Sequence, residues 1–435
     1  MKIIQIPFCF YPDPVGGTEV YVEALSKNLQ EQGCDIVVAS PGRENSAYFH
    51  NNLKVRRFSV LDRLELAQLY GEGDPSALKE FVRILEDEKP EIVHLHAFTS
   101  ANSLKLVMAA RQRGVRVFFT YHTPMVSCQR GTLMHRGKTV CNGKLNLHKC
   151  ASCRLQSLGM SRLGADILGS LPTLAGKLLG RANLNGRLWT ALRMSELVGY
   201  HKNAFGGLMS EADHIITLCN WSKDLLVLNG VPKEKISIIR QGICREIPKE
   251  TKPVEKRGAA LRLAYLGRIH PTKGIDLIIR ALKAVPKLLL ELDIYGILQD
   301  ENGYYKSLLE MAEGDPRISF KEPVPDGRII ETLKNYDFLI VPSQWLETGP
   351  MVVLEAFAAG VPVIGSNLGG IAEIIADGVD GILVEYDSIN RWAAVLEGCF
   401  NNREVFIKLR KGIKRPATMG YVASEMKKLY TTFAG

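Results

Sequence analysis

Short apolar runs alternate with amphipathic segments along the first half of the chain. Runs at 2–10, 35–40, 91–98 and 115–122 are almost continuously apolar, as strands buried on both faces are. Over 18–33, apolar residues recur at helical spacing, with Thr18 as the candidate N-cap and Gly33 as the stop. Strand and helix patterns in alternation predict an α/β domain with a doubly wound parallel sheet.

The second half repeats this pattern. Strand-like runs lie at 261–268, 288–296, 318–324, 337–343, 361–366 and 381–385, with helical patterns between them. We therefore expect two Rossmann-like domains, at 1–240 and 261–412. The stretch 241–260 is rich in Lys, Glu and Pro and is the expected linker. A final helix, at 413–435, can pack back on the amino-terminal domain.

Two glutamates flank a Gly-Pro break in the stretch ETGPMVVLE. Glu347 is expected in the loop after a strand, and Glu355 early in the helix that Pro350 begins. Ligands of doubly wound sheets bind at the carboxyl ends of the strands, so both carboxylates should lie at a cleft mouth. A carboxylate accepts two hydroxyl hydrogen bonds, which suits the vicinal hydroxyls of a ribose or a hexose. The plainer alternative is that Glu355 complements the helix dipole and Glu347 is solvated.

A cation pair and a glycine pair each follow the first strand of one half. Arg268 and Lys273 lie in GRIHPTKG, where a guanidinium and an ammonium beside a helix N-terminus would suit a diphosphate. Gly16 and Gly17 lie between the first strand and the first helix, where a glycine backbone can approach a ligand closely. They do not form the dinucleotide-binding G-x-G-x-x-G pattern. The alternatives are solvated loop cations and a plain turn.

Three histidines lie on neighbouring strands of the first half. His122 ends the run at 115–122 and is expected to point toward the same cleft. His94 and His96 are two residues apart, so they share one side of the sheet. We interpret these two as packed strand histidines.

The stretches GGTEVYVEAL, GRIHPTKG and ETGPMVVLEAFAAGVPVIGSNLGGIAEIIADGVDGILV together resemble family 4 of the retaining glycosyltransferases. That family has the GT-B fold, in which two Rossmann-like domains face each other across an interdomain cleft. The E-x7-E pattern at Glu347 and Glu355 is its most specific mark. The resemblance covers most of the chain; it is strongest over about 205–385 and weakest over 126–202. One departure is Gln241, which stands where the family usually has Asn, and we assign its side chain no role.

The resemblance implies a role for each matching residue. Glu347 would hold hydroxyls of the transferred sugar, which His122 would also contact. Arg268 and Lys273 would neutralise the leaving diphosphate. The implied donor-binding residues are Gly16, Gly17, Val324, Met351, Val352 and Glu355. Within this set, Glu355 would bind the ribose hydroxyls, Val324 would lie beside the base, and the backbone of the other four would approach the phosphates.

The implied reaction is transfer of a hexose from a nucleoside diphosphate sugar, with retention of anomeric configuration. The leaving diphosphate carries two negative charges, which fixed cations and helix N-termini can stabilise. The chain has no D-x-D motif, so a metal-chelating donor site of that type is unsupported, and we expect no cofactor to be required for catalysis. A nucleotide-sugar epimerase or a glycoside phosphorylase on the same fold is the alternative.

Four of the nine cysteines lie within 26 residues, at Cys128, Cys141, Cys150 and Cys153. The last pair is C-x-x-C, a common half of a zinc site. Glycines and basic residues separate the four, as suits a loop without a hydrophobic core of its own. We expect a structural zinc; ordinary thiols or a redox pair, and an iron–sulfur cluster, are the alternatives.

The positive charge of the chain is concentrated in an insert at 126–202. This insert holds twelve Lys/Arg against two Asp/Glu, whereas the net charge of the whole chain is +9. An apolar stripe within it, bent at Pro172, consists of Leu163, Ile167, Leu171, Leu174 and Leu178. Basic residues beside such a stripe are typical of helices at an anionic membrane surface. Helices packed on the amino-terminal domain are the alternative.

These features indicate a lipid-linked or glycan acceptor, as in polysaccharide biosynthesis of the cell envelope. A zinc-containing nucleic-acid-binding protein would explain the cysteines and the basic insert. It would leave Glu347, Glu355 and the cation loop unexplained, so we expect no nucleic acid partner. No apolar run reaches the ~18 residues of a transmembrane helix, and the first residues lack the apolar region of a signal peptide. The expected location is the cytoplasm, peripheral to the cytoplasmic membrane face.

Overall fold

The computed structural model describes residues 1–182, 186–245, 259–298 and 303–433. Contacts divide the chain into two compact units. The first comprises 1–240 together with 419–435, and the second comprises 241–418. Of the linker expected at 241–260, residues 246–258 lie outside the described residues.

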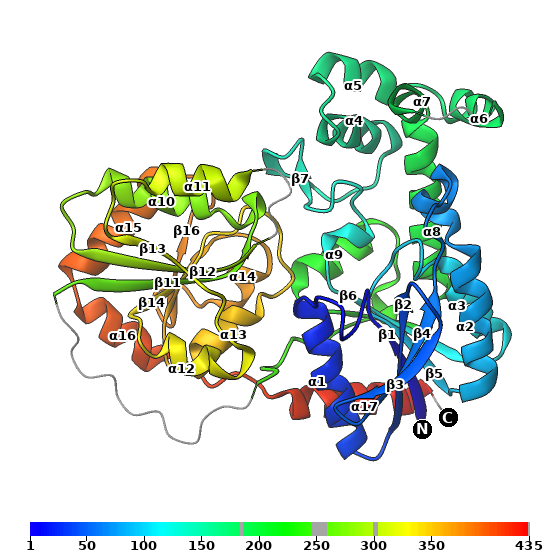
Figure 1. Cartoon of the computed structure of the whole chain (residues 1–435), viewed down its shortest axis with the longest axis horizontal. Helices are drawn as coiled ribbons and strands as arrows, with labels where there is room; N and C mark the ends of the chain where they lie inside the picture. The colour runs from blue at the N-terminus through cyan, green and yellow to red at the C-terminus, as the bar shows by residue number, and fades with distance from the viewer. Residues whose placement is uncertain (183–185, 246–258, 299–302, 434–435) are drawn as a thin grey trace. The chain divides into compact units, whose positions relative to one another are not determined.

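The first unit is built on an eight-stranded sheet (Figure 1). Its strands, in spatial order, are β10 (Ile236–Ile238), β9 (His214–Thr217), β6 (Arg116–Tyr121), β5 (Ile92–Leu95), β1 (Lys2–Ile6), β2 (Asp35–Gly42), β4 (Leu53–Ser59) and β3 (Ser46–His50). Neighbours pair in parallel, except that β3 is antiparallel to β4 at one edge. The apolar run at 2–10 ends as a strand at Ile6, since Pro7 lacks the N–H that a ladder needs.

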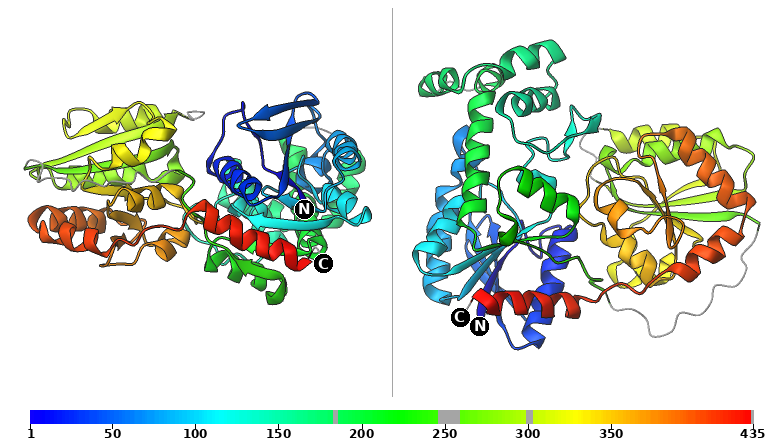
Figure 2. Two further views of the ribbon diagram at one scale, coloured as in Figure 1. Left: turned by 90° about the horizontal axis from the view of Figure 1, so that it is seen from below. Right: turned by 180° about the vertical axis from the view of Figure 1, so that it is seen from behind.

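Helices lie on both faces of this sheet (Figure 2). They include α1 (Gly17–Glu31), α2 (Pro75–Glu88), α3 (Leu104–Gln112), α8 (Met194–Glu211), α9 (Asn220–Leu228) and α17 (Met419–Phe433). The last of these, α17, packs against α1 from the far end of the chain. Gln32 Nε2 donates to Gly420 O at 3.1 Å, and Met426 and Tyr430 are fully buried. The carboxyl-terminal helix is thus part of the core of the first unit.

The start of α1 differs from the prediction. The helix begins at Gly17 with Gly16 as its N-cap, so Thr18 lies inside the first turn and its assignment as the N-cap was wrong. The Glu19 carboxylate instead accepts a hydrogen bond from Gly16 N–H at 2.9 Å, which places negative charge at the positive end of the helix dipole. The predicted stop is confirmed, because Gly33 has φ 84° directly after the helix.

The basic insert forms a group of short elements within the first unit (Figure 1). After η2 (Pro124–Val126), these are β7 (Met134–His135), β8 (Thr139–Val140), α4 (Leu147–Ser157), α5 (Arg162–Gly169), α6 (Thr173–Arg181) and α7 (Arg187–Leu192). Pro172 is the N-cap of α6, so the apolar stripe is divided between two helices and not bent within one. None of the described helices is long and apolar enough to span a bilayer.

These helices pack through small residues and leave large apolar residues outside. A Cβ at Gly169 would lie 2.7 Å from Ser152 N, so only glycine allows this approach. The buried cluster of the insert consists of Ala151, Leu155, Ala165, Ala191, Met194 and Val198. The exposed apolar residues are Leu163, Ile167, Leu174, Leu178 and Leu188. Of the five residues of the predicted stripe, Leu163, Ile167, Leu174 and Leu178 are thus exposed, and Leu171 is half-buried. The helices themselves pack on the first unit, as the alternative expected, since α4, α5 and α6 contact α8 and Tyr70 packs against the buried cluster.

The second unit is a six-stranded parallel sheet with helices on both sides. Its strands, in spatial order, are β13 (Ile318–Lys321), β12 (Leu290–Leu298), β11 (Leu261–Ile269), β14 (Phe338–Val341), β15 (Val363–Ser366) and β16 (Gly381–Val384). Its helices are α10 (Ile275–Ala284), α11 (Tyr304–Ala312), α12 (Ile329–Leu333), α13 (Met351–Ala358), α14 (Gly369–Ile374), α15 (Ile389–Asn401) and α16 (Glu404–Gly412). Phe338 and Ile340 face one buried cluster, and Leu339 and Val341 face the other. This strand is buried on both faces, as its continuous apolar sequence predicts.

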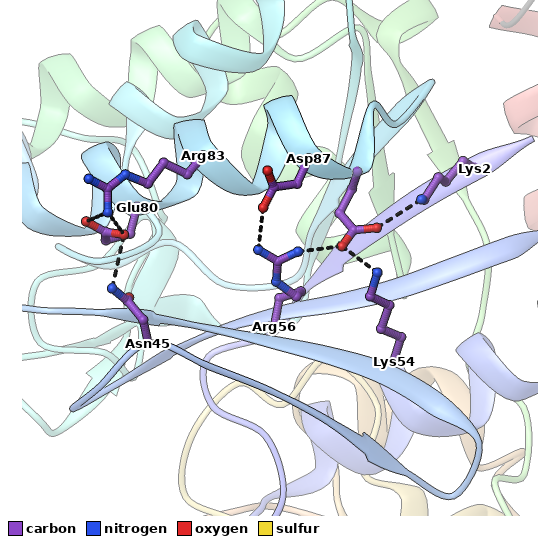
Figure 3. A network of polar contacts seen from close by, with 8 residues as sticks. Lys2, Asn45, Lys54, Arg56, Glu80, Arg83 and Asp87 are labelled. Atoms are coloured by element: carbon purple, nitrogen blue, oxygen red, sulfur yellow. Dashed lines mark hydrogen bonds and ion pairs between the residues drawn. The ribbon is translucent and has the colours of Figure 1, made fainter.

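One buried carboxylate ties α2 to the first sheet. Glu88, at the end of α2, is 4% exposed. It lies 2.9 Å from Lys2 Nζ, and its other oxygen lies 2.7 Å from both Lys54 Nζ and Arg56 Nη1 (Figure 3). Burial by itself would raise the pKa of Glu88, but hydrogen bonds from the three cations outweigh it and lower the pKa to about 2. The stability that this carboxylate contributes is therefore present above its unfolded pKa of 4.5 and is lost as the pH falls toward 2.

We predict that Glu88→Gln lowers the free energy of unfolding by about 2 kcal/mol at pH 7, because three cations lose their shared anion. Asp87→Asn is the matched control, since its mostly exposed carboxylate has an ion pair with Arg56 (Figure 3). That change should cost less than about 0.5 kcal/mol. Urea unfolding measures the free energy of unfolding of both variants. Equal losses in the two would contradict the claim that Glu88 stabilises the fold more than Asp87 does.

Candidate active site

A buried ion pair lies at the carboxyl edge of the second sheet. Lys273 Nζ lies 2.8 Å from Glu347 Oε1, and Ser343 Oγ also donates to that oxygen. Lys273 ends the turn after β11, Glu347 lies in the loop after β14, and these strands are neighbours in the sheet. Lys273 Nζ also lies 5.6 Å from the centroid of the Trp345 ring. The structure therefore brings two of the predicted catalytic residues together.

A glycine allows these two loops to approach each other. Gly274 has φ 68°, and a Cβ at this position would lie 2.1 Å from Pro342 O. Gln344 N–H also donates a hydrogen bond to Thr272 O at 2.7 Å, which joins the same two loops. A larger residue at 274 would push the Lys273 turn away from the Glu347 loop.

Glu347 is held in its charged form. Burial by itself would raise the pKa of its carboxyl, which is 8% exposed. The charge of Lys273 and the hydrogen bonds from Lys273, Ser343 and Trp345 outweigh burial, so the pKa lies below its usual value. The carboxylate is therefore ionised at neutral pH and can act as a hydrogen-bond acceptor.

Arg268 shares this environment. Burial lowers the pKa of His270, and the charges of Arg268 and Lys273 lower it further, so both cations act on the same imidazole. Tyr265 is buried at this end of β11, and its hydroxyl donates to Arg268 O at 2.8 Å. Burial raises the pKa of Tyr265, the charge of Glu347 raises it further, and the charge of Arg268 opposes both. The charges of Arg268, Lys273 and Glu347 thus act on groups at the carboxyl end of β11, where Arg268 itself is exposed.

The second glutamate of the motif has a different partner. Glu355, in α13, is 5% exposed, and its Oε1 accepts a short hydrogen bond from Arg245 Nε. This pair was not predicted from the sequence, in which Arg245 falls in the expected linker. Pro350 is the N-cap of α13, so Met351 and Val352 are its first residues. Their N–H groups have no partner within the helix and can receive an anion.

Two further residues of the second unit, Val324 and Gln241, lie in loops. Val324 follows β13 and is half-buried in a loop. Gln241 Oε1 is buried, and a Cβ at Gly349 would lie 3.2 Å from it. Gln241 therefore packs beside the Gly-Pro break that precedes α13, a position that sequence analysis did not assign to its side chain.

His122 lies in the first unit, directly after β6, and is buried. Its Nε2 lies 2.9 Å from His96 Nδ1, and the Tyr21 ring packs edge-on against it at 5.0 Å between ring centroids. His94 and His96 are buried as well, which confirms their interpretation as packed strand histidines. Burial lowers the pKa of His122 to about 3, so its ring is neutral at pH 7.

Gly16 and Gly17 are exposed at the start of α1. The first N–H groups of a helix point toward an anion placed there. The Glu19 carboxylate already accepts from Gly16 N–H, so a phosphate at this helix end would meet a neighbouring negative charge. Sequence analysis missed Glu19, although a Glu three residues after an N-cap is a known capping signal.

The four clustered cysteines line one small pocket of about 30 Å³ in the insert. Cys153 Sγ accepts from Arg136 N–H at 3.2 Å, and Lys149 Nζ lies 3.5 Å from Cys141 Sγ. Within the ranges that the structure describes, no group of three or more His, Cys, Asp or Glu side chains is arranged to hold a metal ion. The zinc site stays a prediction.

A surface hollow of about 640 Å³ in the second unit lies away from the ion pair. Its lining includes Ala260, Leu290 and Arg317, at the amino ends of the strands. Because parallel sheets of this type bind ligands at the carboxyl ends of their strands, we assign this hollow no role in the site.

Two family models match the chain. Residues 246–417 match "Glycosyl transferases group 1", and residues 15–143 match "Glycosyltransferase Family 4". The D-inositol 3-phosphate glycosyltransferase of Corynebacterium glutamicum is 27% identical over 227 residues, which cover 48% of this chain and 54% of that protein. The enzyme of the same name from Frankia alni is 23% identical over 438 residues, covering 94% and 92%. The lipopolysaccharide 1,2-N-acetylglucosaminetransferase of Salmonella typhimurium is 31% identical over 205 residues, covering 43% and 53%.

The chain spans about half the length of the first curated relatives that it matches. Solved structures match over nearly the whole chain. Sucrose-phosphate synthase from Thermosynechococcus elongatus has a TM-score of 0.67 at 17% identity, covering 99% of this chain and 98% of that one. Anabaena HepE, in complex with UDP-glucose, has a TM-score of 0.64 at 14% identity, covering 99% and 100%. At these identities the likeness shows the fold alone, and it confirms the predicted GT-B fold.

We propose that the four cysteines, which line one pocket, bind one structural zinc ion. Purified protein should then carry about one zinc per chain, measured by elemental analysis under reducing conditions. Cys150→Ser should lose the metal, whereas Cys399→Ser, which alters a buried cysteine of the second unit, should keep it. Protein without metal, in which all four thiols of the insert titrate freely, would contradict the proposal.

Proposed function

The chain belongs to the family 4 type of glycosyltransferases, and we propose that it transfers a hexose, with retention, to a lipid-linked polysaccharide precursor. The matches to the two family models support sugar transfer from a nucleotide sugar as its activity. The acceptor, the stereochemistry and the roles of single residues are the parts that we propose. The observation that carries the residue roles is the Lys273–Glu347 ion pair at the carboxyl edge of the second sheet.

Stabilisation of the leaving group is the main task of this site. Breaking the bond between the anomeric carbon and the phosphate oxygen leaves negative charge on the diphosphate. Arg268 and Lys273 would offset this charge, together with the N–H groups of Met351 and Val352 at the start of α13. The complex of HepE with UDP-glucose supports a nucleoside diphosphate hexose as the class of donor.

Glu347 suits the binding of sugar hydroxyls better than attack on the sugar. One of its oxygens is already engaged by Lys273 and Ser343, which lowers its nucleophilicity. An ionised carboxylate still accepts hydrogen bonds from hydroxyls. Retention would then follow from attack on the same face, in which the acceptor oxygen bonds the anomeric carbon and the leaving phosphate takes the acceptor's proton.

The insert supports a lipid-linked acceptor. Its exposed apolar residues on α5, α6 and α7 lie on the same helices as exposed cations at Arg162, Lys177, Arg181 and Arg187. An apolar surface among cations suits an anionic membrane, where a lipid-linked acceptor is presented. A nucleic acid would use the cations but would leave the exposed leucines without a role.

We predict that Lys273→Ala lowers kcat by about 10²-fold or more, because the developing charge of the leaving diphosphate loses a fixed cation. Glu355→Gln should instead raise the KM for the donor, because the ribose loses a charged acceptor. Release of nucleoside diphosphate measures both effects. Lys283→Ala, on the exposed side of α10, is the control and should behave like the unchanged protein. The proposed site would be wrong if the Lys273 and Glu355 variants both kept wild-type kinetics.

We predict that the protein floats with anionic liposomes at low salt and that high salt releases it. Replacing Arg162, Arg181 and Arg187 with Gln should weaken binding by about 10²-fold, since each cation contributes about 1 kcal/mol at such a surface. The matched control removes the same charge from Arg280, Lys306 and Arg328, whose side chains are exposed in the second unit. Absence of flotation, or an equal loss in the control, would exclude the insert as the membrane contact.

A further inference from the structure

His270 caps the turn that carries Lys273. It precedes η4 (Pro271–Lys273), and its side-chain Nδ1 accepts a hydrogen bond from Thr272 N–H at 3.2 Å. Of the three residues of this turn, Pro271 has no N–H, and Lys273 N–H donates to the backbone oxygen of His270 at 2.9 Å. The imidazole accepts from the third, Thr272. The side chain and the backbone of His270 together thus take both N–H groups of the turn.

The local sequence favours this cap. A residue that precedes proline is biased toward extended backbone, and His270 has φ −149° and ψ 144°. This is the conformation of an N-cap residue, whose side chain can turn back toward the N–H two residues further along the chain. The His270 side chain is half-buried, so water competes with it only in part.

The contact with Thr272 defines the protonation state of the ring. A backbone N–H only donates, so Nδ1 of His270 must present its lone pair, and in a neutral ring the proton is then on Nε2. The Thr272 hydroxyl lies 2.7 Å from the same Nδ1 and can donate to it as well. A protonated ring carries an N–H on both nitrogens. Its Nδ1–H would face Thr272 N–H, and the side-chain bond to the turn would be lost.

The same turn places Lys273 against Glu347. Thr272 O accepts from Gln344 N–H at 2.7 Å, which joins the turn to the loop that carries Glu347. Lys273 Nζ, one residue further on, lies 2.8 Å from Glu347 Oε1. We propose that neutral His270 is a positioning residue, which holds Lys273 in place for the leaving diphosphate and releases it when the ring is protonated. This inference rests on the proposed function, in which Lys273 offsets the charge of that diphosphate.

The groups around His270 favour its neutral form. Burial lowers its pKa from the ordinary 6.5, and the charges of Arg268, on β11, and of Lys273 lower it further. The cap is therefore complete above pH 6.5 and is lost as the pH falls through the lowered pKa. Glu347 faces the turn from the loop after β14, and its pKa lies below its ordinary 4.5. The pKa of Tyr265 is raised, so its hydroxyl stays protonated. A loss that begins above pH 5 therefore comes from neither of these two groups.

Two substitutions at this position test the inference through the pH dependence of diphosphate binding. His270→Asn keeps a side-chain acceptor for Thr272 N–H but does not titrate, whereas His270→Ala removes the acceptor. Calorimetry from pH 8 to pH 5 would use UDP, GDP, ADP, CDP and dTDP. At pH 8 the Ala variant should bind about fivefold more weakly than the unchanged protein, and the Asn variant should retain most of the affinity.

As the pH falls to 5, the affinity of the unchanged protein should fall from that of the Asn variant toward that of the Ala variant. The Asn variant also corrects for protonation of the diphosphate itself, whose last pKa is about 6. An affinity ratio between the unchanged protein and the Asn variant that stays constant with pH would overturn the inference. So would binding by the unchanged protein that strengthens relative to the Asn variant, since the ring would then act as a cation toward the phosphates.

The position of the proton on His270 is a second readout, which needs no ligand. Nitrogen-15 NMR of the full-length protein with labelled histidines reports it, and His270→Asn identifies the signal. We expect the proton on Nε2 at pH 8, and a proton on Nδ1 would overturn the inference. Thermal unfolding identifies a variant that fails to fold, and the NMR result then decides. If the folded protein binds none of the five diphosphates, the proposed function fails, whereas the NMR result still tests the cap.

Discussion

A buried carboxylate needs a cation, and the site of the second unit is arranged around that requirement. Glu347 is almost fully buried, and Lys273 supplies the charge that keeps it ionised. The two residues come from neighbouring strands, so their pairing requires the turn after β11 to press against the loop after β14. Gly274 permits this contact, and the Gln344 to Thr272 hydrogen bond fixes it. Removing either charge would leave the other without its ion-pair partner in a poorly solvated position, which destabilises the loop.

Both units place their candidate site residues at the same kind of position. Gly17 follows β1, His122 follows β6, Lys273 follows β11 and Glu347 follows β14. All of these strands are parallel within their sheets, so their carboxyl ends share one edge in each unit. Loops at that edge can vary without disturbing the strands. The sheets can thus act as rigid supports for the loops that carry the candidate site residues.

Local sequence patterns were sufficient to predict those elements that are buried on every face. The strand β14 is buried on both faces, so its apolar run could be read as a strand from the sequence alone. Local patterns failed where a partner lies far along the chain. Arg245 and Glu355 are 110 residues apart, and no local feature predicts their ion pair. The leucine stripe of the insert was found, but its exposure depends on glycines and alanines that pack on the opposite side, which only the structure shows.

Equilibrium binding of nucleoside diphosphates tests the central claim most directly, because it needs neither the donor sugar nor the acceptor. Calorimetry on folded protein, without added divalent metal, would cover UDP, GDP, ADP, CDP and dTDP. The account predicts saturable binding of at least one of these at one site per chain. It also predicts a loss of about tenfold or more in Arg268→Ala, which removes a charge-assisted contact, and no loss in Arg280→Ala. A folded protein that binds none of the five, or whose binding survives Arg268→Ala unchanged, would contradict it.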